Sequence, residues 1–143
     1  MADNLAPFCA PDTTWLLGGA AGVDTLALVW LAEQPERGRI IVAVPVTVSA
    51  QPAVAAEAIH AATKAGRLSE VVELNHPEGL GAAAYTARNR WLVDRAGLVV
   101  GFPLVPTDDG SGTWETLGYA RAGGRPVVVA ALSDAGYRPA LQP

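Results

Sequence analysis

Apolar residues follow two alternating patterns along the chain. Short unbroken runs, rich in β-branched residues and bounded by glycine, proline or polar residues, are typical of strands buried on both faces of a parallel sheet. Longer stretches carry apolar residues at helical spacing, which predicts helices. The runs predict strands over 15–17, 40–46, 71–74, 98–102 and 126–132, and the stretches predict helices over 23–35, 52–65, 82–95 and 113–122.

The regular alternation of strand and helix predicts an α/β fold. We expect a doubly wound, Rossmann-like parallel sheet of about five strands with helices on both faces. Residues 14–132 would form this domain, between an N-terminal arm over 1–13 and a C-terminal tail over 133–143. Such sheets bind ligands beyond the carboxyl ends of their strands, so the loops to consider are 18–24, 45–52, 75–90 and 103–113.

The first of these loops is rich in glycine and opens a predicted helix. Its glycines allow a tight turn and a close approach to a ligand, and the helix N-terminus offers free N–H groups to an anion. A tight turn with an acidic residue near the helix start is the alternative. The candidate phosphate-binding sequence is Gly18-Gly19-Ala20-Ala21-Gly22-Val23-Asp24.

A second loop of this kind follows the strand predicted over 98–102. Its glycines, hydroxyl groups and helix start fit a phosphate site, and an ordinary helix cap is the alternative. The sequence is Asp109-Gly110-Ser111-Gly112-Thr113-Trp114-Glu115-Thr116. A third motif, Arg88-Asn89-Arg90, carries two guanidinium groups that bind phosphate well, or that simply face solvent on a helix.

Composition narrows the class of protein. The chain has 143 residues, 50% of them hydrophobic and 17% charged, which indicates one ordered domain. The net charge of −4 argues against a nucleic-acid partner. Neither a signal peptide nor an apolar run of about 20 residues is found, so we expect a cytoplasmic protein without membrane contact. Cys9, His60 and His76 lack metal-ligand spacing, and no metal site is expected.

With these motifs the chain resembles the SLOG superfamily of Rossmann-like proteins over roughly residues 14–132. The glycine loop through Asp24 looks most like the YspA-like branch, and Arg88-Asn89-Arg90 is similar to a motif of that branch and of the DNA-processing protein DprA. Ser111-Gly112-Thr113 with Thr116 resembles the matching loop of the LOG (lysine-decarboxylase-like) phosphoribohydrolases. The resemblance implies a nucleotide-binding fold.

The chain departs from this family in two places. Family members begin with a further strand whose turn contributes to the ligand site, and only 13 residues precede Thr14. The LOG enzymes carry a glutamate where this chain has Thr116, and Glu115 lies about 100° away around the helix. The loss of that carboxylate argues against LOG chemistry.

We therefore expect a binding module for a nucleotide such as AMP, ADP-ribose or an NAD-like molecule, with no other cofactor. It would bind through Gly18, Gly19, Gly22, Asp24, Arg88, Asn89, Arg90, Gly110, Ser111, Gly112, Thr113 and Thr116. The alternatives are a nucleoside-monophosphate phosphoribohydrolase, with Glu115 or Asp24 as the catalytic group, and DprA-like binding of single-stranded DNA. A homodimer or higher oligomer is expected, and Gly19, Arg88 and Ser111 should converge on one anion.

Overall fold

The computed structural model describes residues 1–133, and its strands and helices alternate as the apolar pattern predicts. The strands are β1 (Thr14–Leu17), β2 (Arg39–Val44), β3 (Glu70–Glu73), β4 (Val99–Gly101) and β5 (Val127–Val129). The helices between them are α2 (Val23–Glu33), α3 (Ala53–Lys64), α4 (Ala82–Arg95) and α5 (Gly112–Ala122). Short helical turns, α1 (Ala2–Leu5), η1 (Ala6–Phe8) and η2 (Val48–Ala50), complete the order.

The chain divides into two compact units, Met1–Arg88 and Asn89–Pro143, each with its own parallel sheet. In the first unit β2 is the central strand and pairs with β1 on one side and β3 on the other. Burial on both faces explains why β2 is the longest apolar run of the unit. Ile40, Val42 and Val44 on one face of this strand, and Ala43 on the other, are fully shielded from solvent.

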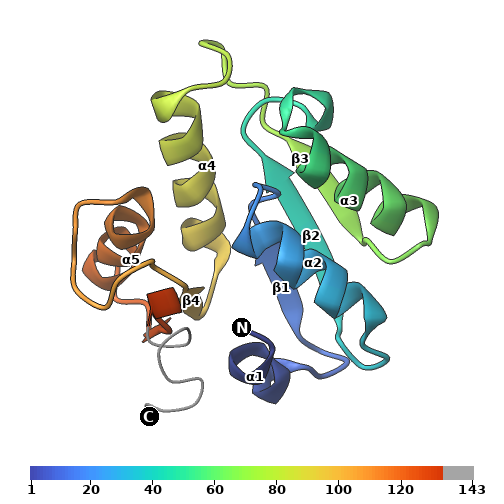
Figure 1. Ribbon diagram of the computed structural model, residues 1–143, viewed down its shortest axis with the longest axis horizontal. Helices are drawn as coiled ribbons and strands as arrows, with labels where there is room; N and C mark the ends of the chain where they lie inside the picture. The colour runs from blue at the N-terminus through green and yellow to red at the C-terminus, as the bar shows by residue number, and fades with distance from the viewer. Residues whose placement is uncertain (134–143) are drawn as a thin grey trace. The chain divides into compact units, whose positions relative to one another are not determined.

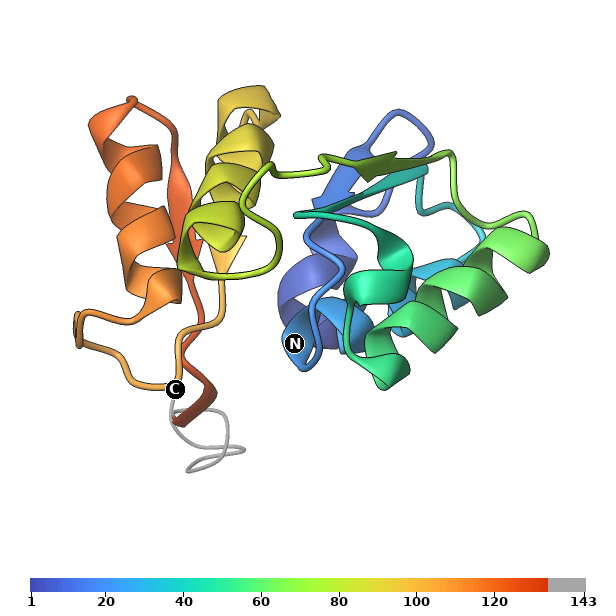
Figure 2. The same ribbon diagram turned by 90° about the horizontal axis from the view of Figure 1, so that it is seen from above.

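Helices α2 and α3 lie side by side on one face of this three-stranded sheet (Figures 1 and 2). Their buried positions recur at the spacing of a helix face turned to a sheet. The residues that fill the layer between helices and sheet include Leu28 and Leu31 of α2 and Ile59 of α3. This packing holds the loop between β1 and α2 against the end of the sheet.

In the second unit β4 and β5 form a two-stranded parallel ladder, and α5 contacts both strands. Gly101 of β4 allows close packing, because a Cβ atom at this position would lie 2.6 Å from Cδ2 of Leu117. Leu117 is buried together with Trp114 and Ala120 on the same face of α5.

The α/β class with parallel strands is confirmed, but the expected single sheet of five strands is wrong. The strands form a sheet of three, in the order β1-β2-β3, and a sheet of two, β4-β5. Within Met1–Arg88 the helices α2 and α3 share one face of the sheet, so the expected doubly wound arrangement is also wrong for this sheet. An apolar run shows that a strand is buried, but strand pairing depends on tertiary contacts that the run does not specify.

The arm expected over residues 1–13 contains the helical turns α1 and η1. Leu5 of α1 is only 4% exposed, so this segment contributes to the packing of the first unit. Of the predicted C-terminal tail, residues 134–143 lie outside the described part of the chain.

Candidate functional site

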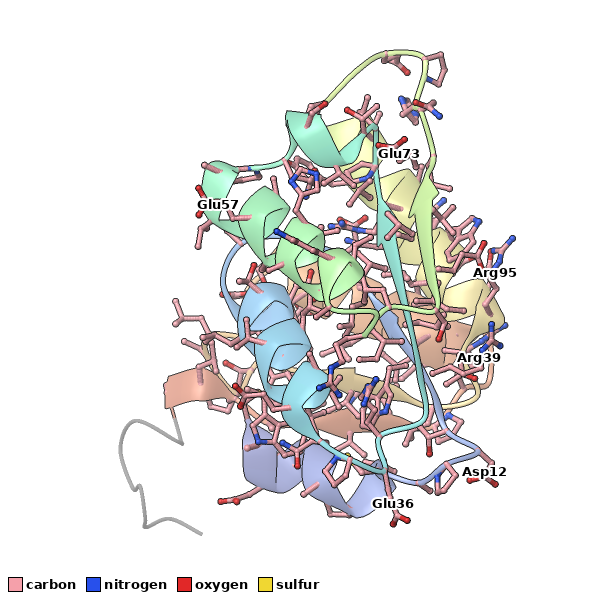
Figure 3. All side chains as sticks on the ribbon, turned by 90° about the vertical axis from the view of Figure 1, so that its right-hand side faces the viewer. Asp12, Glu36, Arg39, Glu57, Glu73 and Arg95 are labelled. Atoms are coloured by element: carbon pink, nitrogen blue, oxygen red, sulfur yellow. The ribbon has the colours of Figure 1, made fainter. Side chains whose placement is uncertain are left out.

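The loop over residues 18–22 joins the carboxyl end of β1 to the start of α2. The loop over 45–52 follows the neighbouring strand β2, which runs parallel to β1. Since parallel strands end at the same edge of a sheet, the two loops meet there, as the sequence predicted. Figure 3 labels Glu73 at this end of the unit, and Asp12 and Glu36 at the opposite end.

Gly18 and Gly19 are buried, and the backbone of Gly19 requires glycine. The φ angle of Gly19 is +63°, a left-handed conformation that a side chain disfavours. A Cβ atom at Gly19 would also lie 2.9 Å from the Cγ1 atoms of Val42 and Val44. The loop therefore turns directly on the end of β2, with no space for a larger residue.

Gly22 occupies the N-cap position of α2, with φ +85° and ψ −130°, and provides no side-chain cap. The N–H groups of the first helical turn have no partner within the helix itself. Gly22 is exposed, and a Cβ atom there would meet nothing within 4 Å. The N-terminus of α2 is thus uncapped and open, with its N–H groups and the positive end of the helix dipole available to an anion.

Beneath this loop lie Asp24 and Arg88, both of which were predicted to bind ligand. Oδ2 of Asp24 accepts a hydrogen bond of 3.2 Å from the N–H of Ala20, and Nη1 of Arg88 donates to the carbonyl oxygen of Gly18. The Arg88 guanidinium also lies 5.7 Å from the ring centroid of Tyr85. These contacts give Asp24 and Arg88 a role in holding the loop in place.

Burial raises the pKa of the Asp24 carboxyl, an effect opposed by the positive charge of Arg88 and by the N–H groups of Ala20 and Gly18. Burial likewise lowers the pKa of Arg88, and the charge of Asp24 opposes this shift. The two groups therefore form a charge pair that is shielded from water. Each charge offsets part of the free-energy cost of burying the other.

Gln51 belongs to this site, although no motif in the sequence predicted it. Its side chain is only 6% exposed, and its Nε2 donates a hydrogen bond of 2.7 Å to the carbonyl oxygen of Gly19. A single glutamine in a loop carries no pattern; the only signal was its position in the loop 45–52. Two contacts hold the backbone of the loop 45–52. The N–H of Val48 donates to Oε2 of Glu73 over 2.8 Å, and the Thr47 side chain caps η2.

In the second unit, the loop before α5 uses its own side chains to satisfy its backbone. Oδ1 of Asp108 accepts a hydrogen bond of 2.9 Å from the N–H of Gly110, and Oδ1 of Asp109 accepts one of 3.0 Å from the N–H of Ser111. The Ser111 hydroxyl caps the N–H of Trp114 at 3.5 Å. Hydrogen bonds from Ser111 lower the pKa of Asp109, so this carboxylate is ionised at neutral pH. An anion here would have to displace these carboxylates.

The other predicted residues of this loop are at the start of α5. Gly112, Thr113 and Glu115 are exposed, and the Thr116 hydroxyl donates to the carbonyl oxygen of Gly112 over 2.8 Å. Gly110 adopts a φ of +78°, which glycine tolerates. Ser111 thus acts as the helix cap that was the alternative interpretation.

The three residues of the Arg88-Asn89-Arg90 motif have different surroundings. Arg88 is buried, Asn89 is half-buried and Arg90 is exposed. The Arg90 guanidinium lies 5.0 Å from the ring centroid of Tyr119, whose hydroxyl donates a 2.8 Å hydrogen bond to Asp94. This bond raises the pKa of Tyr119. Packing on an aromatic ring therefore accounts for the position of Arg90.

Within residues 1–133, histidine, cysteine, aspartate and glutamate side chains nowhere gather in a group of three that could hold a metal ion. The helices of the same described range are all too short or too polar to cross a membrane. Comparison with models of protein families, with curated proteins and with solved structures finds no match to this chain.

Proposed function

We propose that the chain binds a nucleotide through its phosphate at the N-terminus of α2. The observation that carries this proposal is the open helix start at Gly22, which has no side-chain cap and follows a buried turn at the carboxyl end of β1. Uncapped helix N-termini after glycine turns suit phosphate, because several N–H groups point in one direction and the helix dipole adds to their effect. AMP, ADP-ribose and NAD are the expected ligands.

The surrounding residues would keep this site in a fixed shape. Gly19 brings the turn close to β2, and the Asp24–Arg88 pair holds the backbone of Gly18 and Ala20. A turn that is held before the ligand arrives loses less conformational entropy on binding. The further prediction that Gly19, Arg88 and Ser111 converge on one anion stays a prediction.

Calorimetry with AMP, ADP-ribose and NAD tests the proposal. Ala21 is exposed in the loop, so Ala21→Glu adds a negative charge next to the expected phosphate without crowding the core. Repulsion between two charges a few ångströms apart near a protein surface is about 1–3 kcal/mol, so binding should weaken about 5- to 150-fold. The matched control is Ala61→Glu, which adds the same charge at an exposed position near the C-terminal end of α3. Wild-type protein that binds none of the three at millimolar concentration would refute the proposal.

A binding function is favoured over the phosphoribohydrolase alternative by the contacts of the two candidate catalytic groups. Asp24 is engaged with Ala20 and Arg88 in the first unit, which fits a positioning role. Glu115 is exposed on α5, so it lacks the enclosed surroundings in which a general acid would face a bound substrate. We accordingly expect no release of free base from nucleoside monophosphates, and release abolished by Glu115→Ala would favour the enzyme instead.

We also propose that the chain is a cytoplasmic SLOG-like protein that self-associates. The proposal of self-association is supported by Leu26 and Val29, which lie one turn apart on α2 and are 59% and 50% exposed. Helices with apolar residues all around are usually packed against other protein surfaces on every side. Size-exclusion chromatography with light scattering should show an oligomer that Leu26→Lys weakens, and a monomeric wild type at micromolar concentration would contradict it.

A further inference from the structure

Gln51 has one amide atom that its surroundings leave unsatisfied. Its Nε2 donates to Gly19, but its Oε1 is shielded from solvent and has no hydrogen-bond partner among the described residues. Buried polar atoms are nearly always paired in folded proteins, and an unpaired acceptor costs free energy. Such an atom beside a candidate ligand loop indicates a partner that belongs to the ligand.

The orientation of the Gln51 amide follows from which of its atoms can donate a hydrogen bond. The carbonyl oxygen of Gly19 can only accept a hydrogen bond, so the nitrogen of the Gln51 amide must face it at 2.7 Å. The remaining atom, Oε1, is therefore an acceptor that can be satisfied only by a donor. A phosphate monoester is mostly deprotonated at neutral pH and offers mainly acceptors, whereas a sugar hydroxyl offers a donor.

We propose that Oε1 of Gln51 accepts a hydrogen bond from a hydroxyl of the ligand's sugar, and so makes the site selective for a ribose over a deoxyribose. This inference rests on the proposed function, because it places the sugar next to a phosphate bound at α2. Gln51 contacts Gly19, and Gly19 lies three residues before the N-cap Gly22, so sugar and phosphate would contact opposite ends of one short loop. Because Oε1 is screened from solvent, a small local movement at Gln51 must expose it to the hydroxyl on binding, while the contacts to Gly18 and Ala20 keep the turn in place.

Calorimetry with AMP, 2′-deoxy-AMP and 3′-deoxy-AMP tests the inference. In the wild type, at least one deoxy compound should bind about tenfold more weakly than AMP, since removal of the hydroxyl leaves Oε1 unpaired again. In Gln51→Met the three compounds should bind within about twofold of one another, because the acceptor is gone. The matched control is Gln34→Met, which removes a comparable glutamine donor to a backbone carbonyl, that of Trp30, at the far end of α2. The control should keep the tenfold ratio.

The ratio of affinities separates this inference from the proposed function. If all three compounds bind the wild type equally, or if Gln51→Met keeps the wild-type ratio, the inference is wrong and phosphate binding stands. If no compound binds, both fail. Should Gln51→Met lose its cooperative unfolding, the wild type decides with the AMP analogue that carries fluorine in place of the 2′- or 3′-hydroxyl, whichever hydroxyl the deoxy compounds identify. Fluorine is close to a hydroxyl in size but cannot donate a hydrogen bond, so weak binding of this analogue supports the inference and binding as tight as that of AMP overturns it.

Discussion

Gly19 is the position at which the local structure of the candidate site depends most directly on one residue. Alanine at this position would meet two separate penalties. The φ of +63° costs a residue with a Cβ atom about 1–2 kcal/mol. The new methyl group would also lie 2.9 Å from Val42 and Val44 and 3.2 Å from Ile59, and crowding of this kind costs about 1–3 kcal/mol. We therefore expect Gly19→Ala to lower the free energy of unfolding by about 2–5 kcal/mol.

A matched variant isolates the crowding from the backbone strain. Gly66 follows α3 with a φ of +70°, and a Cβ atom there would meet nothing within 4 Å. Gly66→Ala should cost only about 1–2 kcal/mol, the strain alone. Urea denaturation followed by circular dichroism gives both values through the change in midpoint. If the two variants lose equal stability, the claim that Gly19 is needed for packing on β2 is refuted.

Two further outcomes are expected. Gly101→Ala places a methyl group against Leu117 and should lower the free energy of unfolding by about 1–3 kcal/mol. Gly97→Ala adds a methyl group in open space and should change this free energy little. Equal urea midpoints for the two variants would contradict this. Burial raises the pKa of Asp24, so the native state keeps that proton to a higher pH than the unfolded chain does. The stability of the wild type relative to Asp24→Asn should therefore fall as pH increases above about 4, and a rise in urea titrations would show that Arg88 outweighs burial.

The positions of the strands and helices could be predicted because their signals are local. The run over 40–46 predicted β2, and the strand ends at Val44 because Pro45 has no N–H group for the ladder. Pairing could not be predicted in the same way. The run over 98–102 indicated a buried strand equally well, but did not show that β4 would pair only with β5 among the described strands.

The same distinction applies to the candidate site. The glycine loop before α2 could be located from its residues, since a turn after an apolar run and before a helical pattern is a local feature. The roles of Gln51 and Arg88 depend on contacts with Gly19 and Gly18, which are 32 and 70 residues away in the chain. In the sequence Arg88 and Arg90 look like a pair, but burial separates them: Arg88 lies under the loop and Arg90 is exposed on an aromatic ring.

The two glycine-rich loops are similar in sequence but differ in what already occupies their N–H groups. Before α5, the carboxylates of Asp108 and Asp109 accept from the loop backbone, and Ser111 caps the helix. An anion there would compete with two negative charges of the loop itself. Before α2, the single carboxylate of Asp24 is opposed by the charge of Arg88, and Gly22 leaves the helix without a cap. A phosphate therefore gains more at α2, because the N–H groups there are open and the nearby negative charge is balanced.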